Sequence, residues 1–378
     1  MAEQAGRRAR ELGIAPGRHR PGALNAITDV AGVRVGQVTL HREPGIRTGV
    51  TAIVPDLVDC AGGQLPAGVF TGNGYGKLTG VTQLAELGVL ETPIVLTGTL
   101  SVFRAADALV SYVLDLPGNE EVRSVNAVAG ETNDGFLSDI RARPVTAGDV
   151  LAALSSACGG PVAEGATGAG TGTGALGFKA GIGTSSRVAE LAGGPPVTVG
   201  VLLQANFSGT LTVLGVPIPA AAALAVPAGG SAEPDGAGSP EPGRGRPEPG
   251  RTRAVQTDPA RQGNSCMIIV AVDQALDSRQ LGRVARRAVF GLGRAGSDFA
   301  GGSGDYAIAL AATGSGPPVP DRELDPVFGA VQETVEEAVL NSVFMATTTE
   351  GHQGHVLRAC PHEFVLRACR AAGVLPED

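Results

Sequence analysis

Apolar positions recur along the chain with two different periods, which predicts a protein built from both helices and strands. Short apolar or alternating runs predict strands at 33–40, 50–55, 93–99, 122–129, 197–206, 210–216, 266–272 and 306–312. Apolar residues three and four apart predict helices at 81–90, 102–116, 146–157, 278–293, 325–346 and 362–372. Because the strands cluster and do not alternate strictly with helices, we expect an α/β (α+β) fold of stacked layers rather than a doubly wound parallel sheet.

The segment 226–263 interrupts this pattern. It consists mostly of Pro, Gly, Ser, Glu and Arg and has few apolar side chains. Such a composition cannot bury enough apolar surface to offset the entropy lost on ordering, so we predict a disordered or surface segment at about 227–263. A linker between two domains is one interpretation, but the strongly apolar strand at 266–272 follows almost at once.

The charge and aromatic content exclude nucleic acid as a partner. Lys and Arg (29) are outnumbered by Asp and Glu (37), which gives a formal net charge of −8 at pH 7. Phosphate backbones bind to cationic surfaces and single strands also use aromatic platforms, yet aromatic residues make up only 3% of the chain and Trp is absent. A hydrophobic content of 43% is ample for a packed core.

Cysteine usage and the first residues of the chain predict a cytoplasmic protein. The five cysteines are scattered, with no spacing typical of a zinc site, so reduced thiols fit best. Residues 1–22 are rich in Arg and lack the apolar core of a secretory signal. No apolar run reaches the length of a membrane span, so we expect no membrane partner.

Glycine-rich stretches and two histidines are weaker signals. The GxGxxG motif at 291–296 closes a predicted helix instead of opening one, and the stretch 165–174 lacks the lysine of a phosphate-binding loop. Structural turns are therefore favoured over a nucleotide site. His352 and His355 lie in a glycine-broken segment and do not share a helix face, which favours surface or hydrogen-bonded histidines over metal ligands. We expect neither a metal nor an organic cofactor.

Ser265 is the strongest candidate nucleophile. It stands where the Pro- and Gly-rich segment meets the apolar strand, so cleavage of the Asn264–Ser265 bond would disturb little structure and would leave the new N-terminus at the edge of a core. An N-terminal nucleophile needs both properties: its hydroxyl attacks its own upstream carbonyl, and its freed α-amine, with a pKa of about 8, acts as a general base. An ordinary serine at a strand start is the alternative. Cys266 would be the nucleophile if cleavage fell one residue later.

Four further polar residues lie in apolar or glycine-rich surroundings. Ser303 and Asp305 open a strand and point the same way, so a hydroxyl and a carboxylate can orient the nucleophile or its amine; a glycine-rich turn is the alternative. Asn206 ends an apolar strand, where its amide can donate to a developing oxyanion. Lys179 is either an exposed loop charge or the buried partner of a carboxylate, and the only other lysine is Lys77.

These residues lie within segments that resemble the P1 family of peptidases, the L-aminopeptidase/D-esterase and β-peptidyl aminopeptidase group. The similar segments follow in the family's order: LNAITDVAGVRVGQVTL, RTGVTAIVP, FTGNGYGKLTG, GETNDGFLSDI, PVAEGATGAGTG, FKAGIGTSSR, TVGVLLQAN, VARRAVFGLGRAGS and GSGD. They cover most of the chain, so the resemblance is far more specific than one short motif.

The resemblance implies a stacked four-layer αββα sandwich and a hydrolase that cuts itself into fragments 1–264 and 265–378, the second beginning with the nucleophile. The implied substrates are short peptides, amides or esters with a free amine. The implied partners are the chain's own cleaved fragment and further copies in a homo-oligomer, a tetramer. The resemblance implies that Ser265 is the nucleophile and that Ser303 and Asp305 assist it. It also implies that Asn206 donates to the oxyanion and that Lys179 lies near the site.

Other interpretations stay open. Some family members supply a tyrosine hydroxyl to the oxyanion hole, but the segment ETNDGFL has no Tyr, and Asn133 is a candidate substitute. The related nylon-oligomer hydrolases and ornithine acetyltransferase-like enzymes use Thr as nucleophile, and the former carry a second acid where Ser303 stands. Ser265 and Ser303 therefore favour the peptidase branch. A binding protein that never cuts itself is the alternative from a different class.

Overall fold

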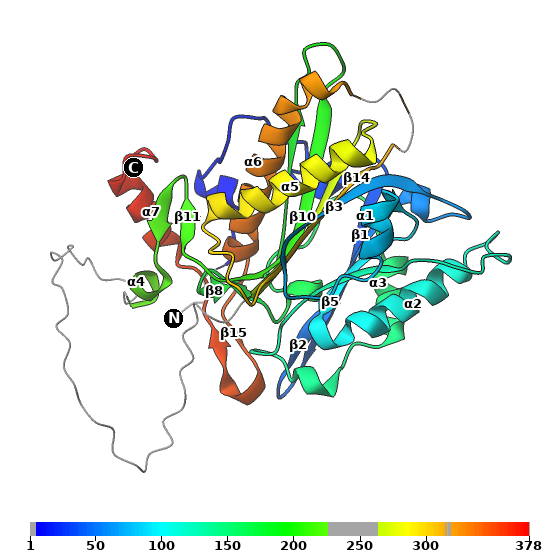
Figure 1. The fold of residues 1–378 in the computed structure, drawn as a ribbon. Coiled ribbons are helices and arrows are strands. Elements are labelled where there is room, and N and C mark those ends of the chain that lie inside the picture. The colour runs from blue at the N-terminus through cyan, green and yellow to red at the C-terminus, as the bar shows by residue number, and fades with distance from the viewer. Residues whose placement is uncertain (1–4, 226–263, 314–315, 317–318, 378) are drawn as a thin grey trace.

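The computed structural model describes residues 5–225, 264–313, 316 and 319–377, and the predicted linker at 227–263 lies outside them (Figure 1). The strands are β1 (Val33–Arg42), β2 (Ile46–Pro55), β3 (Leu65–Gly74), β4 (Val89–Leu90), β5 (Ile94–Gly98), β6 (Val128–Thr132), β7 (Gly174–Ala175), β8 (Phe178–Lys179), β9 (Ile182–Ala189), β10 (Val197–Phe207), β11 (Leu211–Val213), β12 (Val216–Ile218), β13 (Asn264–Val272), β14 (Gly304–Ala311), β15 (Thr349–Glu350) and β16 (Val356–Leu357). The α-helices are α1 (Val81–Glu86), α2 (Val102–Leu114), α3 (Ala147–Ser155), α4 (Ala220–Ala225), α5 (Ser278–Ala295), α6 (Asp325–Phe344) and α7 (His362–Ala371).

The described residues form four layers, with two β-sheets packed face to face between two layers of helices (Figure 1). One sheet has the strand order β1-β2-β5-β6, and α2 and α3 cover its outer face. The other has the order β4-β3-β14-β13-β10-β9, and α5 and α6 cover its outer face. The αββα sandwich predicted from the sequence is confirmed.

Alternation along β13 explains how one strand serves two hydrophobic layers. Cys266, Ile268 and Val270 belong to the core beneath α5 and α6, whereas Met267 and Ile269 belong to the core between the two sheets. Successive side chains of a strand point to opposite faces, so a strand buried on both faces is apolar at every position. The unbroken apolar run at 266–272 therefore marks a central strand.

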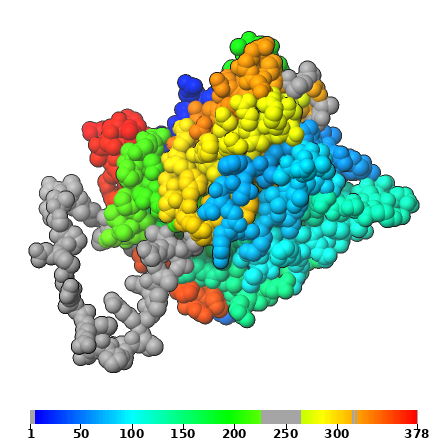
Figure 2. All heavy atoms as spheres, in the orientation of Figure 1, coloured from blue at the N-terminus to red at the C-terminus, as the bar shows by residue number. Residues whose placement is uncertain are grey.

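Long strands from both sides of the segment 226–263 belong to one sheet. β13 pairs antiparallel with β10, which precedes the segment, and parallel with β14, which follows it. In Figure 2 the yellow residues that follow the segment are packed between green residues that precede it and blue residues of the N-terminal third. The interpretation of this segment as a linker between two separate domains is therefore wrong.

Two of the longer strands, β3 and β9, were not predicted because their sequences are not simply apolar, and the two-residue strands β4, β7, β8, β15 and β16 were not predicted either. β3 is rich in glycine, and β9 reads IGTSSRVA although every residue in it is buried. Gly183 lets α6 approach β9, because a Cβ at that position would lie 1.9 Å from the Ala338 carbonyl oxygen of the helix. The guanidinium of Arg187 is buried and pairs with Glu333 and Glu337, also on α6, which offsets part of the cost of removing its charge from water.

Three expected elements have different bounds in the structure. The strand expected at 122–129 is β6, which begins later because Val122 lies in a hydrogen-bonded turn. The helix expected at 81–90 is the shorter α1, after which Gly88 (φ 65°) turns the chain into β4. The strand expected at 210–216 is the hairpin of β11 and β12, which turns at Leu214 and Gly215.

Both ends of α5 follow local capping rules. Asp277 and Gln280 form a capping box at the start of α5, and Gly296, the last glycine of the GxGxxG motif, ends the helix with φ 103°. The motif thus closes a helix, as predicted. None of the helices in the described part of the chain is both long enough and apolar enough to cross a membrane.

Candidate active site

Ser265 lies at the start of β13, between the two strands that carry Asn206 and the Ser303–Asp305 segment. In the sheet it is paired with Asn206 at the end of β10 and with Gly304 at the start of β14. Its side chain is buried, with 4% of the residue exposed, and its hydroxyl oxygen accepts a hydrogen bond from the Gly304 N–H at 3.3 Å. Three distant parts of the sequence therefore meet at one end of the six-stranded sheet.

Ser303 and Asp305 flank this glycine and contact each other. The Ser303 hydroxyl donates to Asp305 Oδ1 at 2.8 Å, and both residues are buried. Burial raises the pKa of Asp305 to about 6, against the opposing effect of the Ser303 hydrogen bond. In the sheet Asp305 pairs with Cys266, so its carboxylate lies beside the backbone that follows the nucleophile. Its other oxygen, Oδ2, has no hydrogen-bond partner among the described residues.

Asn206 is held at both ends of its side-chain amide. Nδ2 donates to the backbone carbonyl of Asn133 at 2.9 Å, and Oδ1 accepts from the Gly174 N–H at 3.2 Å. A primary amide has two N–H hydrogens, so one such bond leaves the second hydrogen for an oxyanion. The side chain of Asn206 faces the space between the sheets, as does the hydroxyl of its strand partner Ser265.

Asn133 touches the site through its backbone. Its carbonyl, on the loop that follows β6, is the group that fixes Asn206. Its side chain is exposed and its Oδ1 accepts from the N–H of Gly135, which closes a local turn. The contact with the site therefore belongs to the main chain, and the expectation that this side chain replaces a tyrosine hydroxyl stays a prediction.

Lys179 is fully buried, which rules out the exposed loop charge considered from the sequence. Its ammonium donates to the carbonyl oxygens of Gly170, at 3.1 Å, and of Ala180. Burial lowers the pKa of this lysine to about 7. Among the described residues, the hydrogen-bond partners of its ammonium are backbone carbonyls and not the carboxylate that the sequence analysis considered. In the β7–β8 hairpin Lys179 faces Gly174, the residue whose N–H holds Asn206.

Sequence reasoning missed Glu131, a carboxylate close to this cluster. Glu131 is buried in β6, and its Oε1 accepts hydrogen bonds from the backbone N–H of Lys77 at 2.9 Å and from the Lys77 ammonium at 3.2 Å. Gly76 lies next to both Glu131 and Gly304, the strand partner of Ser265. A Cβ built on Gly76 would be 3.4 Å from Glu131 Oε1 and 3.3 Å from Gly304 Cα. The one available signal was a lone acid at the end of an apolar strand.

The two histidines outside the site are engaged in ordinary contacts. His355 shares a hydrogen bond of 2.8 Å with the Phe136 carbonyl oxygen, and the two rings stack with their centroids 4.4 Å apart. The backbone N–H of His352 donates to Leu137. In the described part of the chain, no group of three or more His, Cys, Asp or Glu side chains is arranged to hold a metal ion.

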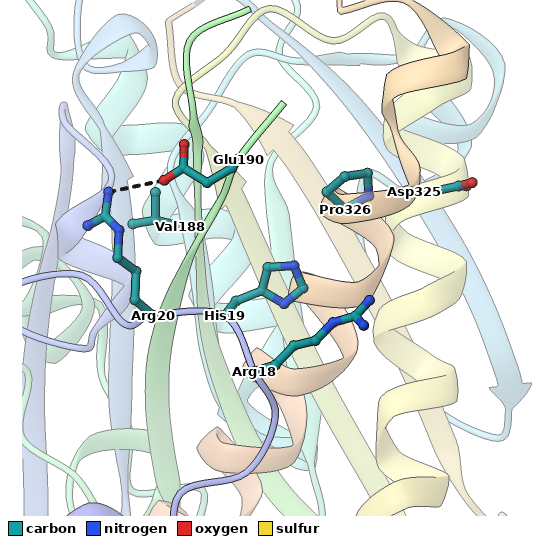
Figure 3. Close-up of a pocket in the computed structure, with 7 residues that line it drawn as sticks. All are labelled: Arg18, His19, Arg20, Val188, Glu190, Asp325 and Pro326. Carbon is teal, nitrogen blue, oxygen red and sulfur yellow. Dashed lines mark hydrogen bonds and ion pairs between the residues drawn. The ribbon is translucent and has the colours of Figure 1, made fainter. Parts of the chain in front are cut away.

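A pocket of about 620 Å³ lies elsewhere on the molecule (Figure 3). Arg20 and Glu190 form an ion pair on one side of it, while Asp325 and Pro326 at the start of α6 form the other side. Val188, in its wall, pairs with the first residues of β10, whereas Ser265 pairs with the end of β10. The pocket is therefore at the opposite end of the sheet from the candidate nucleophile.

Comparison with known proteins places this arrangement in a family. Residues 25–357 match the pattern of peptidase family S58. The chain belongs to peptidase family S58. The resemblance to this group of peptidases, drawn from the sequence segments, is confirmed.

Individual relatives agree with that assignment along nearly the whole chain. The β-peptidyl aminopeptidase BapA of Sphingosinicella microcystinivorans is 35% identical over 390 residues, covering 96% of this chain and 91% of that protein. The Burkholderia sp. β-aminopeptidase structure has a TM-score of 0.81 and 34% identity, covering 98% of this chain and 100% of the other. The L-aminopeptidase D-Ala-esterase/amidase of Ochrobactrum anthropi, described as a variant of the Ntn-hydrolase fold, has a TM-score of 0.81 and 33% identity, covering 98% and 99%.

The family and these relatives establish the general activity. This S58 member is a hydrolase that acts as an aminopeptidase, and it shares the α/β fold of the Ntn-hydrolase aminopeptidases. The matches support this activity over the acetyltransferase-like, nylon-oligomer-hydrolase-like and non-enzymatic alternatives considered from the sequence.

Proposed function

We propose that this S58 member is a self-processing serine aminopeptidase whose nucleophile is Ser265. The observation that carries the proposal is the position of Ser265 as the second residue of the buried central strand β13. There it is paired with Asn206 on one side and with Gly304, whose N–H contacts its hydroxyl, on the other. Asn206 on β10 and Ser303 and Asp305 at the start of β14 lie at the same end of the sheet as Ser265, which supports roles as oxyanion donor and assisting groups in acyl transfer.

The proposed self-cleavage uses the nucleophile's own peptide bond. Ser265 Oγ attacks the carbonyl carbon of Asn264, and the hydroxyl proton passes to the departing Ser265 nitrogen, which leaves an ester between the two residues. Water then hydrolyses the ester, giving the Asn264 carboxylate and a free α-amine on Ser265. The products are fragments 1–264 and 265–378.

The freed amine is the proposed general base for substrate turnover. It takes the Ser265 hydroxyl proton as Oγ attacks the substrate carbonyl, and it gives that proton to the leaving amine. Asn206 Nδ2 donates to the oxyanion. Asp305, held by Ser303, stabilises the ammonium form of the α-amine through its negative charge. Water then releases the acyl group and restores the enzyme.

Lys179 is the proposed positioning residue behind the oxyanion donor. Its ammonium ties the carbonyls of Gly170 and Ala180 together around the hairpin whose Gly174 N–H holds Asn206. A buried ammonium with carbonyl partners alone is costly, so a role in the site is the reason to retain it.

Glu131 is the proposed anchor for the amine of the substrate. An aminopeptidase recognises a free ammonium group, and a buried carboxylate is the natural partner for it. Gly76 lies next to both Glu131 Oε1 and Gly304, the residue whose N–H contacts the Ser265 hydroxyl, which supports an amine anchor close to the nucleophile. The proposed substrates are therefore short peptides, amides or esters with a free amine at the residue that is released.

Intact-mass spectrometry of the purified protein tests the proposal directly. We expect the wild type to give two masses with Ser265 at the new N-terminus, and Ser265→Ala to give one full-length mass. Cys266→Ala is the matched control: it should cut at the same bond. A wild type that stays whole after prolonged incubation, or a Cys266→Ala variant that alone fails to cut, would remove Ser265 from this role.

The finer biological expectations are part of the same proposal. Reduced cysteines in the described residues, Cys60, Cys158, Cys266, Cys360 and Cys369, are compatible with a cytoplasmic enzyme. The resemblance implies a homo-tetramer, and two exposed apolar residues, Leu100 just before α2 and Phe103 in its first turn, offer surface for such contacts. Analytical ultracentrifugation at micromolar concentration would show one species at four times the chain mass.

A further inference from the structure

Lys77 is a charged residue beside the site that the proposed mechanism does not use. The chain has only two lysines, and this one follows β3 directly, in the loop that lies against Gly304. Its ammonium donates to Glu131 Oε1 at 3.2 Å and to the Thr99 hydroxyl at 2.6 Å. The Lys77 ammonium is therefore bound to Glu131, the carboxylate proposed to bind the substrate amine.

The two charged groups differ in their freedom to move. The Glu131 side chain is 2% exposed and is also fixed by the backbone N–H of Lys77, whereas the Lys77 side chain is 44% exposed. A buried carboxylate keeps its place, while a half-exposed lysine can swing its ammonium through several rotamers. An incoming ligand can therefore reach Glu131 by moving the Lys77 ammonium aside.

The charges of Glu131 and Lys77 determine which ligand binds most favourably once the Lys77 ammonium has moved aside. Glu131 and Lys77 cancel each other in the free enzyme. A substrate that brings only an ammonium adds a positive charge next to Lys77, and like charges at this range repel. A substrate that brings an ammonium and a carboxylate gives each group of the enzyme an opposite charge.

We propose that Lys77 selects substrates whose first residue carries a side-chain carboxylate beside its free amine, that is, an N-terminal Asp or Glu residue. This inference rests on the proposed function, because it needs Glu131 as the amine anchor and Ser265 as the nucleophile. The ammonium of the substrate replaces Lys77 on Glu131, and the substrate carboxylate takes the Lys77 ammonium. A neutral first residue gains only the first of these contacts.

Steady-state hydrolysis of Asp, Glu and Ala p-nitroanilides by the mature enzyme tests the proposal. The measured quantity is the ratio of kcat/KM for the acidic substrates to kcat/KM for the alanine substrate. In Lys77→Met we expect this ratio to fall by about tenfold or more, because one charge-assisted contact is lost and the repulsion of a bare ammonium is relieved. Lys77→Arg keeps the charge and should keep the ratio within a few-fold of the wild type.

The outcomes separate this inference from the proposed function. If Lys77→Met changes kcat/KM for all three substrates by the same factor, or if Lys77→Arg lowers the ratio as much as Met does, the selective role is overturned while the aminopeptidase proposal stands. If the wild type cleaves itself but hydrolyses neither acidic substrate faster than the alanine substrate, the selective role is overturned and the self-processing proposal stands. Lys77→Gln serves in place of Met if that variant does not fold, as judged by circular dichroism and by its self-cleavage.

Discussion

Burial moves the pKa values of the two ionisable groups proposed to support the nucleophile in opposite directions. The pKa of Asp305 rises to about 6 and that of Lys179 falls to about 7, in both cases mainly because burial disfavours the charged form. Among the residues that the structure describes, no group of opposite charge forms an ion pair with Asp305 or Lys179. Charges kept under such conditions weaken the folded state, which is the usual compromise at a functional site.

Replacing the buried lysine should separate stability from activity. In Lys179→Met the apolar side chain fills a similar volume without a charge to bury. We therefore expect the free energy of unfolding at pH 7 not to fall, and to rise by up to about 1 kcal/mol. The loss of the ammonium loosens the hairpin that holds Asn206, so kcat should fall about tenfold with a smaller change in KM. Thermal unfolding and p-nitroanilide kinetics measure the two effects.

The pH dependence gives the same prediction an independent check. Because the pKa of Lys179 is lower in the folded chain than its ordinary value of 10.5, the unfolded chain binds more protons between about pH 7 and 10.5. The contribution of Lys179 to stability therefore improves as pH rises through that window, and Lys179→Met should remove this rise. A variant that is clearly less stable than the wild type at pH 7 would show instead that the lysine is a structural support.

Asp305 should set the acid limb of self-cleavage. In the uncut chain its pKa is raised from 3.8 to about 6, so the carboxylate is lost as pH falls through 6. Because Asp305 pairs with Cys266, its negative charge lies close to the departing Ser265 nitrogen and should favour the transfer of the hydroxyl proton to it. We therefore expect the first-order rate of self-cleavage to drop on going from pH 7 to pH 5, and Asp305→Asn to be slower by about a hundredfold at pH 7 with little change between these pH values. Time courses of fragment formation on gels give the rates. An unchanged pH profile in Asp305→Asn would assign the limb to another group.

The residues of the site differed in how well the sequence revealed them. Ser265, Ser303 and Asp305 stand at abrupt changes from glycine-rich to apolar sequence, and such changes are visible locally. Glu131 carries no comparable pattern, because its meaning comes from Lys77, which is distant in sequence and reaches it only through the fold. The burial of Lys179 was equally invisible, since flanking glycines fit an exposed loop as well as a tight core.

At the scale of elements, the site depends on how closely β14 and the loop after β3 approach each other. The contact is backbone against backbone: Gly304 faces Gly76, and the N–H of Tyr75 donates to the Ser303 carbonyl oxygen. The same approach brings Glu131 near the nucleophile. Small residues are therefore required on both sides of the contact.

A methyl group at Gly304 should damage the site. In Gly304→Ala the new Cβ would lie 2.9 Å from Gly76 Cα and 3.0 Å from the Tyr75 carbonyl oxygen, so the backbone must shift. We expect self-cleavage at least about tenfold slower and a loss of about 1–3 kcal/mol in the free energy of unfolding. Gly301→Ala, in the same glycine-rich run, is the matched control because a Cβ there meets nothing within 4 Å. Equal behaviour of the two variants would refute the argument from close approach.

Elements buried entirely among apolar side chains could be predicted from the sequence. Elements whose buried side chains include polar residues could not. β13 lies between two apolar layers, so its sequence is apolar throughout and its identity as a buried strand was plain. β9 is equally buried, but its Thr, Ser and Arg side chains are satisfied by partners on other elements, such as Asn25 and Glu337. Tertiary partners of this kind leave no periodic pattern within the strand itself.

At the scale of the whole molecule, the chain order and the spatial order of the strands differ. β13 and β14, which follow the proposed cut, lie between β10 and β3, which precede it. The layered architecture could be expected from the clustering of strands and from the family resemblance. The interleaving of the two parts could not, because strand order in a sheet depends on pairings between distant segments.

This interleaving predicts that the two fragments remain one particle after cleavage. Separating 1–264 from 265–378 would open both pairings of the central strands and expose the core beneath α5 and α6 as well as the core between the sheets. The mature protein and uncut Ser265→Ala should therefore elute at the same volume in size-exclusion chromatography. Native mass spectrometry should find both fragments in one complex, which dissociates only in denaturant. Fragments that separate in native buffer would mean that the sheet reorganises once the chain is cut.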